Sequence, residues 1–190
     1  MSSFSCNTRR ANSPMRSRAL GAGIALMLLS GAALADGAHR FVFTAYSDAA
    51  GGRDIVAGRY RAAIEKLNRY PHIMDTRSSA TNTNLCVAYA MTLQWRSAHA
   101  ACDAAVSEAR EQRDATPAWW GAIPASADAV AVAYANRAVM HWLLHDEAAA
   151  RKDLARAQEL SPRARFVARN LAALKMHAML AQAGTPTPKS

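Results

Sequence analysis

The side chains that could carry chemistry are few and dispersed along the chain. His141 and His145 stand four residues apart, a spacing that brings two imidazoles to one face of a helix, where they could bind a metal ion. In the alternative interpretation, His141 fills a core position and His145 lies in a turn. We favour the structural interpretation and expect neither a metal nor another cofactor.

The sequence lacks the short motifs of the common enzyme classes. It contains no glycine-rich phosphate loop, no G-x-S-x-G and no H-E-x-x-H. Cys86 and Cys102 form neither C-x-x-C nor C-x-x-C-H. Asp146 and Glu147 stand where a helix is expected to begin, and negative charge there favours capping over catalysis. We therefore predict that the protein is not an enzyme.

Two adjacent tryptophans, Trp119 and Trp120, are the most unusual feature of the chain. They lie between Pro117 and Gly121, in a segment expected to be a loop. An exposed aromatic pair could anchor a partner protein. The alternative is that the loop folds back and both rings cover the helices.

The N-terminal 35 residues predict export. An uncharged run, ALGAGIALMLLSGAALA, spans residues 19–35, follows Arg16 and Arg18, and ends in the small residues that a signal peptidase accepts. The run is too short and too rich in Ala and Gly for a spanning helix. We predict a cleaved signal peptide at residues 1–35, a periplasmic protein and no stable membrane anchor. An uncleaved anchor is the alternative, and Met15 offers a second start site.

The net charge of +9 exaggerates the basicity of the folded part. The first 35 residues carry four arginines and no acidic residue, which leaves +5 on the remainder. This modest excess does not indicate a nucleic-acid partner.

The hydrophobic pattern predicts an all-α protein. From residue 54 onward, apolar residues recur at spacings of three and four, as in amphipathic helices. Residues 36–53 form an expected N-terminal arm, in which the β-branched and aromatic stretch RFVFTAY at 40–46 predicts a short strand or an extended segment. A helical domain is expected over 54–183, with a loop insertion at 111–125 and a disordered tail at 184–190.

The helical part contains internal repeats. Asn84 aligns with Asn136 at an offset of 52 residues, and Asn136 aligns with Asn170 at an offset of 34. The segment from Tyr134 to Pro162 resembles one tetratricopeptide repeat, which has the same period of 34. Its characteristic positions are matched by small or bulky residues and a closing proline: Ala138, Ala150, Leu154, Ala157 and Pro162.

The resemblance departs from the family pattern at His141, where an aromatic residue is usual, and at His145, where the turn glycine is usual. Residues 84–110 resemble a second repeat, and a degenerate one precedes them. The resemblance implies a short solenoid of helical hairpins closed by a terminal capping helix at 164–182.

The resemblance also implies a binding site. Such arrays bind peptides on the concave surface formed by the first helix of each pair, which here is apolar and predicts an apolar or amphipathic ligand segment. The expected partner-binding residues on this face are Val87, Met91, Asn136, Val139 and Trp142.

Asn136 matches an asparagine that some members of the family use to hold a peptide carboxylate. The cationic residues of that clamp are missing, because Thr83 and Phe166 stand where lysines would be. In an alternative interpretation the asparagines only form hydrogen bonds between adjacent helices.

The repeat alignment places Cys86 and Cys102 on facing sides of one helix pair. They are the only cysteines that remain after signal removal, and the periplasm is oxidising. We predict a structural disulfide, with two buried free thiols as the alternative.

Taken together, these features predict a non-catalytic interaction or adaptor protein of the cell envelope. Its partner is expected to be an unknown protein or peptide in the periplasm. The alternative is an envelope accessory protein that binds a small molecule or a metal between its helices.

Overall fold

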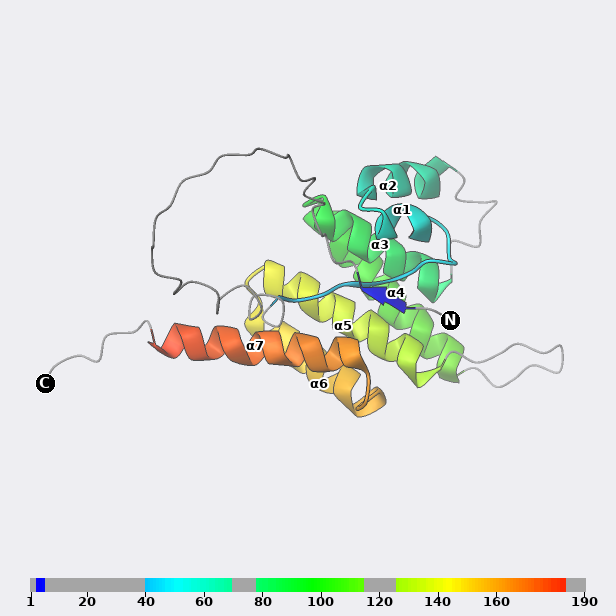
Figure 1. Cartoon of the computed structure of the whole chain (residues 1–190). Helices are drawn as coiled ribbons and strands as arrows, with labels where there is room; N and C mark the ends of the chain where they lie inside the picture. The colour runs from blue at the N-terminus through cyan, green and yellow to red at the C-terminus, as the bar shows by residue number, and fades with distance from the viewer. Residues whose placement is uncertain (1–2, 6–39, 70–77, 115–125, 184–190) are drawn as a thin grey trace, which may run out of the picture.

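The computed structural model describes residues 3–5, 40–69, 78–114 and 126–183 (Figure 1). Helices dominate these residues, in agreement with the predicted all-α class. The elements are β1 (Ser3–Ser5), β2 (Thr44–Tyr46), α1 (Gly52–Val56), α2 (Tyr60–Arg69), α3 (Ser79–Met91), α4 (Trp95–Asp114), α5 (Ala127–Leu143), α6 (Glu147–Leu160) and α7 (Arg165–Ala183).

Parts of the sequence predictions lie outside the described residues. These parts are most of the signal peptide, the pair Trp119 and Trp120, and the tail at 184–190. Residues 111–114 of the predicted loop insertion belong to helix α4, and residues 115–125 lie outside the described residues. Within the described part of the chain, no helix is long and apolar enough to cross a membrane.

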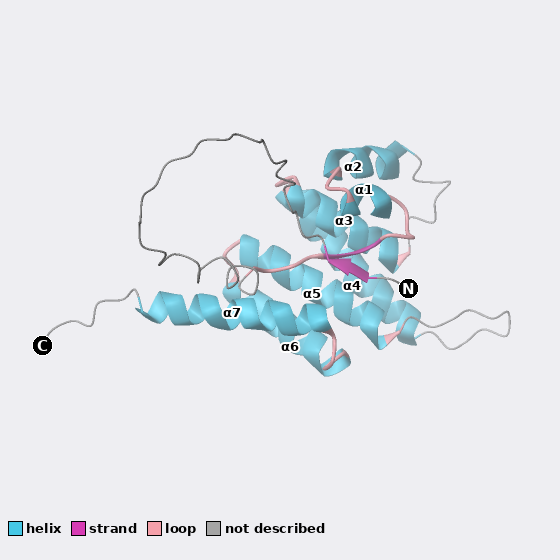
Figure 2. Ribbon diagram, viewed as in Figure 1, coloured by secondary structure: helices cyan, strands magenta, loops and turns pink. Residues whose placement is uncertain are grey.

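Helices α3 and α4 form one antiparallel pair, and α5 and α6 form another. Ser79 at the start of α3 bonds to Gln112 near the end of α4, with 2.9 Å between the side-chain oxygens. Ser161, just after α6, bonds in the same way to Asp128 at the start of α5, at 2.5 Å. Helix α7 packs against both α5 and α6 and ends the described chain (Figure 2).

The turns within the three successive helix pairs share one backbone geometry. Each turn contains a residue with a left-handed backbone: Gly58 at φ 74°, Leu93 at φ 60° and His145 at φ 62°. The residue that follows donates its N–H to a carbonyl five positions earlier, a bond that satisfies a terminal carbonyl of the preceding helix. These bonds join Arg59 to Asp54, Gln94 to Tyr89, and Asp146 to His141, at 2.8, 2.9 and 2.9 Å.

Helix starts are fixed by capping side chains. The side chain of Ser126 accepts the N–H of Ala129 at 3.1 Å and caps the start of α5. Asp146 accepts the N–H of Ala149 at 3.0 Å in the same role. The capping function predicted for the acidic residues that open α6 is therefore confirmed for Asp146.

Small residues allow the paired helices to approach closely. Ala138 on α5 and Ala150 on α6 are fully buried, and so are Leu154 and Ala157 one and two turns further along α6. A helix that presents alanine at the contact brings its axis closer to its neighbour than one that presents larger side chains. The core between α5 and α6 thus uses the residues that the repeat pattern singled out.

The pair α3 and α4 carries a covalent link. Cys86 and Cys102 form a disulfide, their Cα atoms are 4.7 Å apart, and both residues are fully buried. The predicted disulfide is confirmed.

Candidate functional site: an extended arm held by three asparagines

Residues 40–46, here called the arm, run in extended conformation across helices α7, α5 and α3 (Figure 2). One asparagine from each of these helices binds the main chain of the arm. Each carboxamide accepts the N–H of one arm residue and donates to the C=O of the same residue. The pairs are Asn170 with Val42 (2.8 and 3.0 Å), Asn136 with Thr44 (2.8 and 2.7 Å) and Asn84 with Tyr46 (both 2.9 Å).

We call this row of asparagines the asparagine ladder. Each one can pair with the main chain of the arm because a carboxamide has an N–H donor and a C=O acceptor, as a peptide group does. All three asparagines are at most 1% exposed, so their polar atoms depend on the arm for hydrogen bonds. Since they bind every second residue, they hold one edge of an extended chain without reading its side chains. Asn84 also donates to the carbonyl of Ala50 at 3.0 Å and so fixes the point where the chain turns toward α1.

The odd-numbered side chains of the arm pack on one side. The ring of Phe41 lies 4.9 Å from that of Trp142 and 5.8 Å from that of His177. Phe43 and Ala45 are buried in the apolar cluster around α3. The arm is therefore integrated into the core by its odd-numbered residues.

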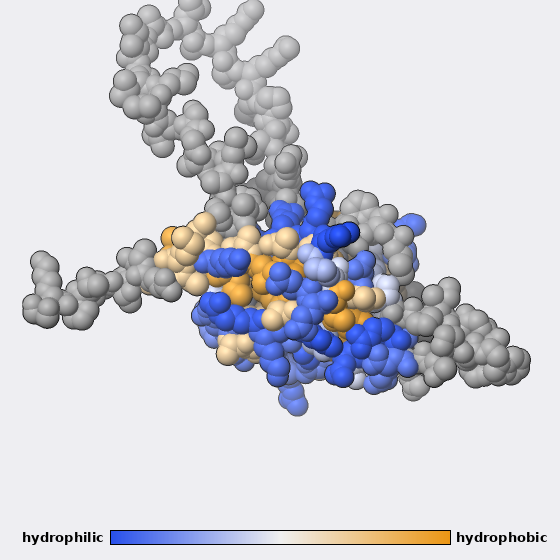
Figure 3. All heavy atoms as spheres, turned by 90° about the horizontal axis from the view of Figure 1, so that it is seen from below, coloured by the Kyte–Doolittle hydropathy of each residue, from blue (hydrophilic) through white to orange (hydrophobic). Residues whose placement is uncertain are grey.

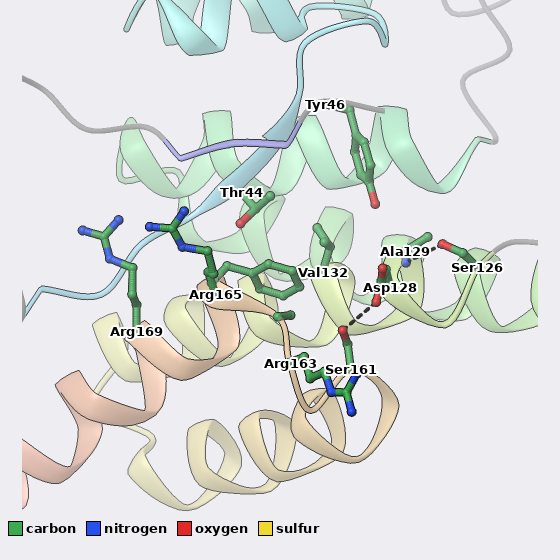
Figure 4. A pocket seen from close by; sticks show the side chains of 12 residues that line it. Thr44, Tyr46, Ser126, Asp128, Ala129, Val132, Ser161, Arg163, Arg165 and Arg169 are labelled. Carbon is green, nitrogen blue, oxygen red and sulfur yellow. Dashed lines mark hydrogen bonds between the residues drawn. The ribbon is translucent and has the colours of Figure 1, made fainter.

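Even-numbered residues of the arm face a cavity of about 650 Å³ on the other side. Thr44 and Tyr46 line it together with the start of α5 and the start of α7 (Figure 4). Its charged lining residues are Asp128, Arg163, Arg165 and Arg169. Burial, together with the nearby carboxylates of Asp128 and Asp48, raises the pKa of Tyr46 to about 12, so its hydroxyl stays protonated at neutral pH.

The predicted partner-binding face is closed by the arm. Val87 and Val139 are at most 1% exposed, as is Asn136, and the expectation of an open surface at these residues is wrong. Trp142 is partly covered by Phe41, whereas Met91 is 41% exposed. Because the arm already fills this face, none of the buried residues is available to a ligand while the arm is bound.

The interpretations of Asn136 are corrected as well. It holds the backbone of Thr44 rather than a terminal carboxylate, and it does not link neighbouring helices. Asn84 and Asn170 are functional residues that sequence reasoning did not assign to the site. Their spacing of 52 and 34 residues from Asn136 was the available signal, because it places all three at equivalent positions of successive helices.

A charged cluster joins the two cysteine-linked helices to the α5–α6 pair. Arg137 donates two hydrogen bonds to Asp153, at 2.7 and 2.9 Å, and a third to Asp103 on α4 at 2.9 Å. These bonds raise the pKa of Arg137. His99 contacts the other oxygen of Asp103 at 2.9 Å. The cluster is a structural link, since each charged group has an opposite charge beside it.

The two candidate metal ligands have different surroundings. His141 is half-buried near Asp153, and burial lowers its pKa, whereas His145 is exposed in the turn. Among the described residues, no group of three or more His, Cys, Asp or Glu side chains is arranged to hold a metal ion.

Exposed apolar side chains gather at the far end of α7. Met179 and Leu180 are 64% and 60% exposed. Figure 3 shows this end of the molecule as a hydrophobic surface next to a mostly hydrophilic one.

Comparisons of the chain with family models, with curated proteins and with solved structures give no match.

Proposed function

We propose that this protein is a non-catalytic interaction module of the cell envelope that binds extended segments of partner proteins. The observation that carries the proposal is the asparagine ladder. Three buried carboxamides on three helices hold an extended chain by its backbone. Such a device accepts a segment by its conformation, which suits an adaptor that meets varied sequences.

The repeat architecture supports this proposal. The three helix pairs share one turn geometry, and the ladder asparagines fall at equivalent positions of α3, α5 and α7. Both features suit a short tetratricopeptide-like solenoid whose first helices form the concave face. The arm lies where a peptide ligand of such a solenoid would lie.

The arm also indicates the chemistry of the ligand. It is an amphipathic extended segment, RFVFTAY, with apolar residues on one side and Thr44 and Tyr46 on the other. A partner segment of similar character suits the surroundings of the arm, beside which it would lie while the ladder keeps the arm. With the predicted signal peptide, the proposed location is the periplasm.

Peptide binding tests the proposal. The exported protein is screened against an array of extended peptides, and the binders are measured again in solution by fluorescence polarisation. We expect amphipathic or apolar extended sequences to bind, and versions interrupted by proline to fail, because proline removes a backbone donor. If no peptide binds, the proposed function is wrong.

The cavity beside the arm favours a second candidate function, in which the protein binds a small molecule between its helices. Its volume of about 650 Å³ falls in the range of ligand pockets, and it combines an apolar wall with charged groups. Native mass spectrometry of the exported protein distinguishes the two functions. A stoichiometric small molecule that Val132→Trp excludes, in the absence of peptide binding, supports the second.

A further inference from the structure

The outer edge of the arm has main-chain groups that the ladder does not use. In an extended chain, successive residues direct their N–H and C=O to opposite edges. Because Val42, Thr44 and Tyr46 face the asparagines, Phe43 and Ala45 direct theirs to the opposite edge. This outer edge therefore offers donors and acceptors to another strand.

In the full chain this edge is paired with β1. Ser3–Ser5 lies antiparallel to β2, with Ser3 opposite Tyr46, Phe4 opposite Ala45 and Ser5 opposite Thr44 (Figures 1 and 2). The pairing shows that the outer edge accepts an antiparallel strand in this register. β1 belongs to residues 1–35, the segment that the proposed cleavage removes, so export takes this strand away.

We propose that the outer edge of β2 is the docking site for an extended segment of a partner protein, in which acidic and apolar residues alternate. The segment adds to β2 as an antiparallel strand and leaves the arm on the ladder. This inference rests on the proposed function, since it assumes an exported protein that binds extended segments. It adds the site of binding and the charge of the ligand.

The charge follows from the surroundings of the even-numbered arm residues. Residues opposite each other in an antiparallel pair share a face. Partner residues opposite Thr44 and Tyr46 therefore lie on the cavity side, where three arginines and one aspartate line the wall. Figure 4 shows Arg165 and Arg169 on the side of Thr44, with Arg163 farther away, beside Ser161. Acidic side chains at these partner positions complement the exposed Arg165, which lines the cavity on the side of Thr44.

A partner chain suits the site better than a second copy of the protein. Thr44 and Ala45 are 2% and 0% exposed when β1 is paired to β2, so other residues closely surround β2. A slender extended chain reaches its outer edge, as β1 does. The β2 strand of a second copy would bring the residues that flank it into the same space.

The test uses the protein purified from the periplasm and a synthetic seven-residue peptide with glutamate and valine at alternate positions. Two further versions of the peptide carry N-methyl groups on the main chain. One is methylated at the valines, and the other, methylated at the glutamates, is the matched control. In the proposed register the valines oppose Phe43 and Ala45 and direct their N–H to β2, whereas the glutamates direct theirs to solvent. We expect methylation at the valines to weaken binding by at least about tenfold and methylation at the glutamates to leave it within about twofold.

Two exposed arginines test the charge. Arg165→Glu is expected to weaken binding of the glutamate peptide about tenfold, and Arg96→Glu on α4, away from the cavity, is expected to leave it unchanged. Amide hydrogen exchange by NMR reports the position of the arm. On binding, the amides of Phe43 and Ala45 gain protection, and that of Thr44 stays protected.

Four results would overturn the inference. One is equal weakening by both methylation patterns, and another is loss of protection at Thr44, which would mean that the ligand replaces the arm. The third is failure of the glutamate peptide to bind. The intact mass of the purified protein shows whether β1 has been removed, and failure to bind counts against the inference in either case. If uncharged amphipathic peptides still bind, the proposed function survives this failure. If no peptide binds, both the inference and the proposed function are wrong. A dimer formed without peptide through β2 would assign the edge to a second copy.

Discussion

The side-chain amide of Asn136 bonds to both main-chain groups of Thr44, at 2.8 and 2.7 Å, across 92 residues of sequence. Asn84 and Asn170 repeat this relationship with Tyr46 and Val42. Because the arm enters the fold through these bonds, it contributes to stability as well as to the proposed binding site.

Asn136→Ala should lower the free energy of unfolding by about 3 kcal/mol, because it leaves the N–H and C=O of the buried Thr44 without partners. Urea unfolding followed by circular dichroism measures the change. The control is Asn68→Ala, which removes an exposed contact with the Tyr89 hydroxyl and should cost no more than about 0.5 kcal/mol. Equal effects of the two substitutions would contradict the role of the ladder.

Val139→Asp should destabilise the fold by at least about 3 kcal/mol, because Val139 is 1% exposed and the substitution buries an unpaired charge. The thermal melt should shift far below that of the wild type. Leu143→Asp on the same helix is the matched control, since Leu143 is 42% exposed. A Val139→Asp protein that melts like the control would show that the arm does not cover this face.

Reduction of the Cys86–Cys102 disulfide should lower stability by about 3 kcal/mol, as expected for a link between residues 16 positions apart. Added reductant should lower the melting temperature of the wild type and leave that of a Cys86→Ala, Cys102→Ala double variant unchanged. Alkylation under denaturing conditions counts free thiols. Two labelled cysteines in the unreduced protein would rule out the bond.

The free energy of unfolding should fall in mildly acidic solution because His141 becomes protonated. Burial lowers the pKa of this imidazole in the folded state, although Asp153 and Asp146 oppose the effect, and Arg137 and His99 add to it. The unfolded chain then binds the proton more readily, so stability is complete above the ordinary histidine pKa of about 6.5 and is lost as the pH falls through that value. Urea unfolding between about pH 5 and about pH 8 should show this loss, and His141→Gln should reduce it. A pH dependence that is identical in the variant would assign the effect to other groups.

The helical part of the fold was predictable because its signals are local. Periodic apolar residues predicted the helices, and two small residues of the repeat pattern, Ala138 and Ala150, lie buried in the α5–α6 pair. The disulfide followed from the placement of Cys86 and Cys102 on one helix pair.

The site was harder to predict because its interactions are long-range. An asparagine on the inner face of a helix can bind a neighbouring helix, a ligand or a distant segment of its own chain, and residue spacing does not distinguish these partners. The pattern RFVFTAY indicated an extended segment but not that its even-numbered residues would bind three helices. The open face predicted at Val87 and Val139 was wrong for this reason.

Amide hydrogen exchange of the arm tests the asparagine ladder most directly. In the exported wild-type protein, the amides of Val42, Thr44 and Tyr46 should exchange slowly, because each is bonded to a buried asparagine. Asn136→Ala should accelerate exchange at Thr44 most strongly. If all three wild-type amides exchange as fast as those of an unfolded chain, the arm is not held by the ladder and the proposed site does not exist.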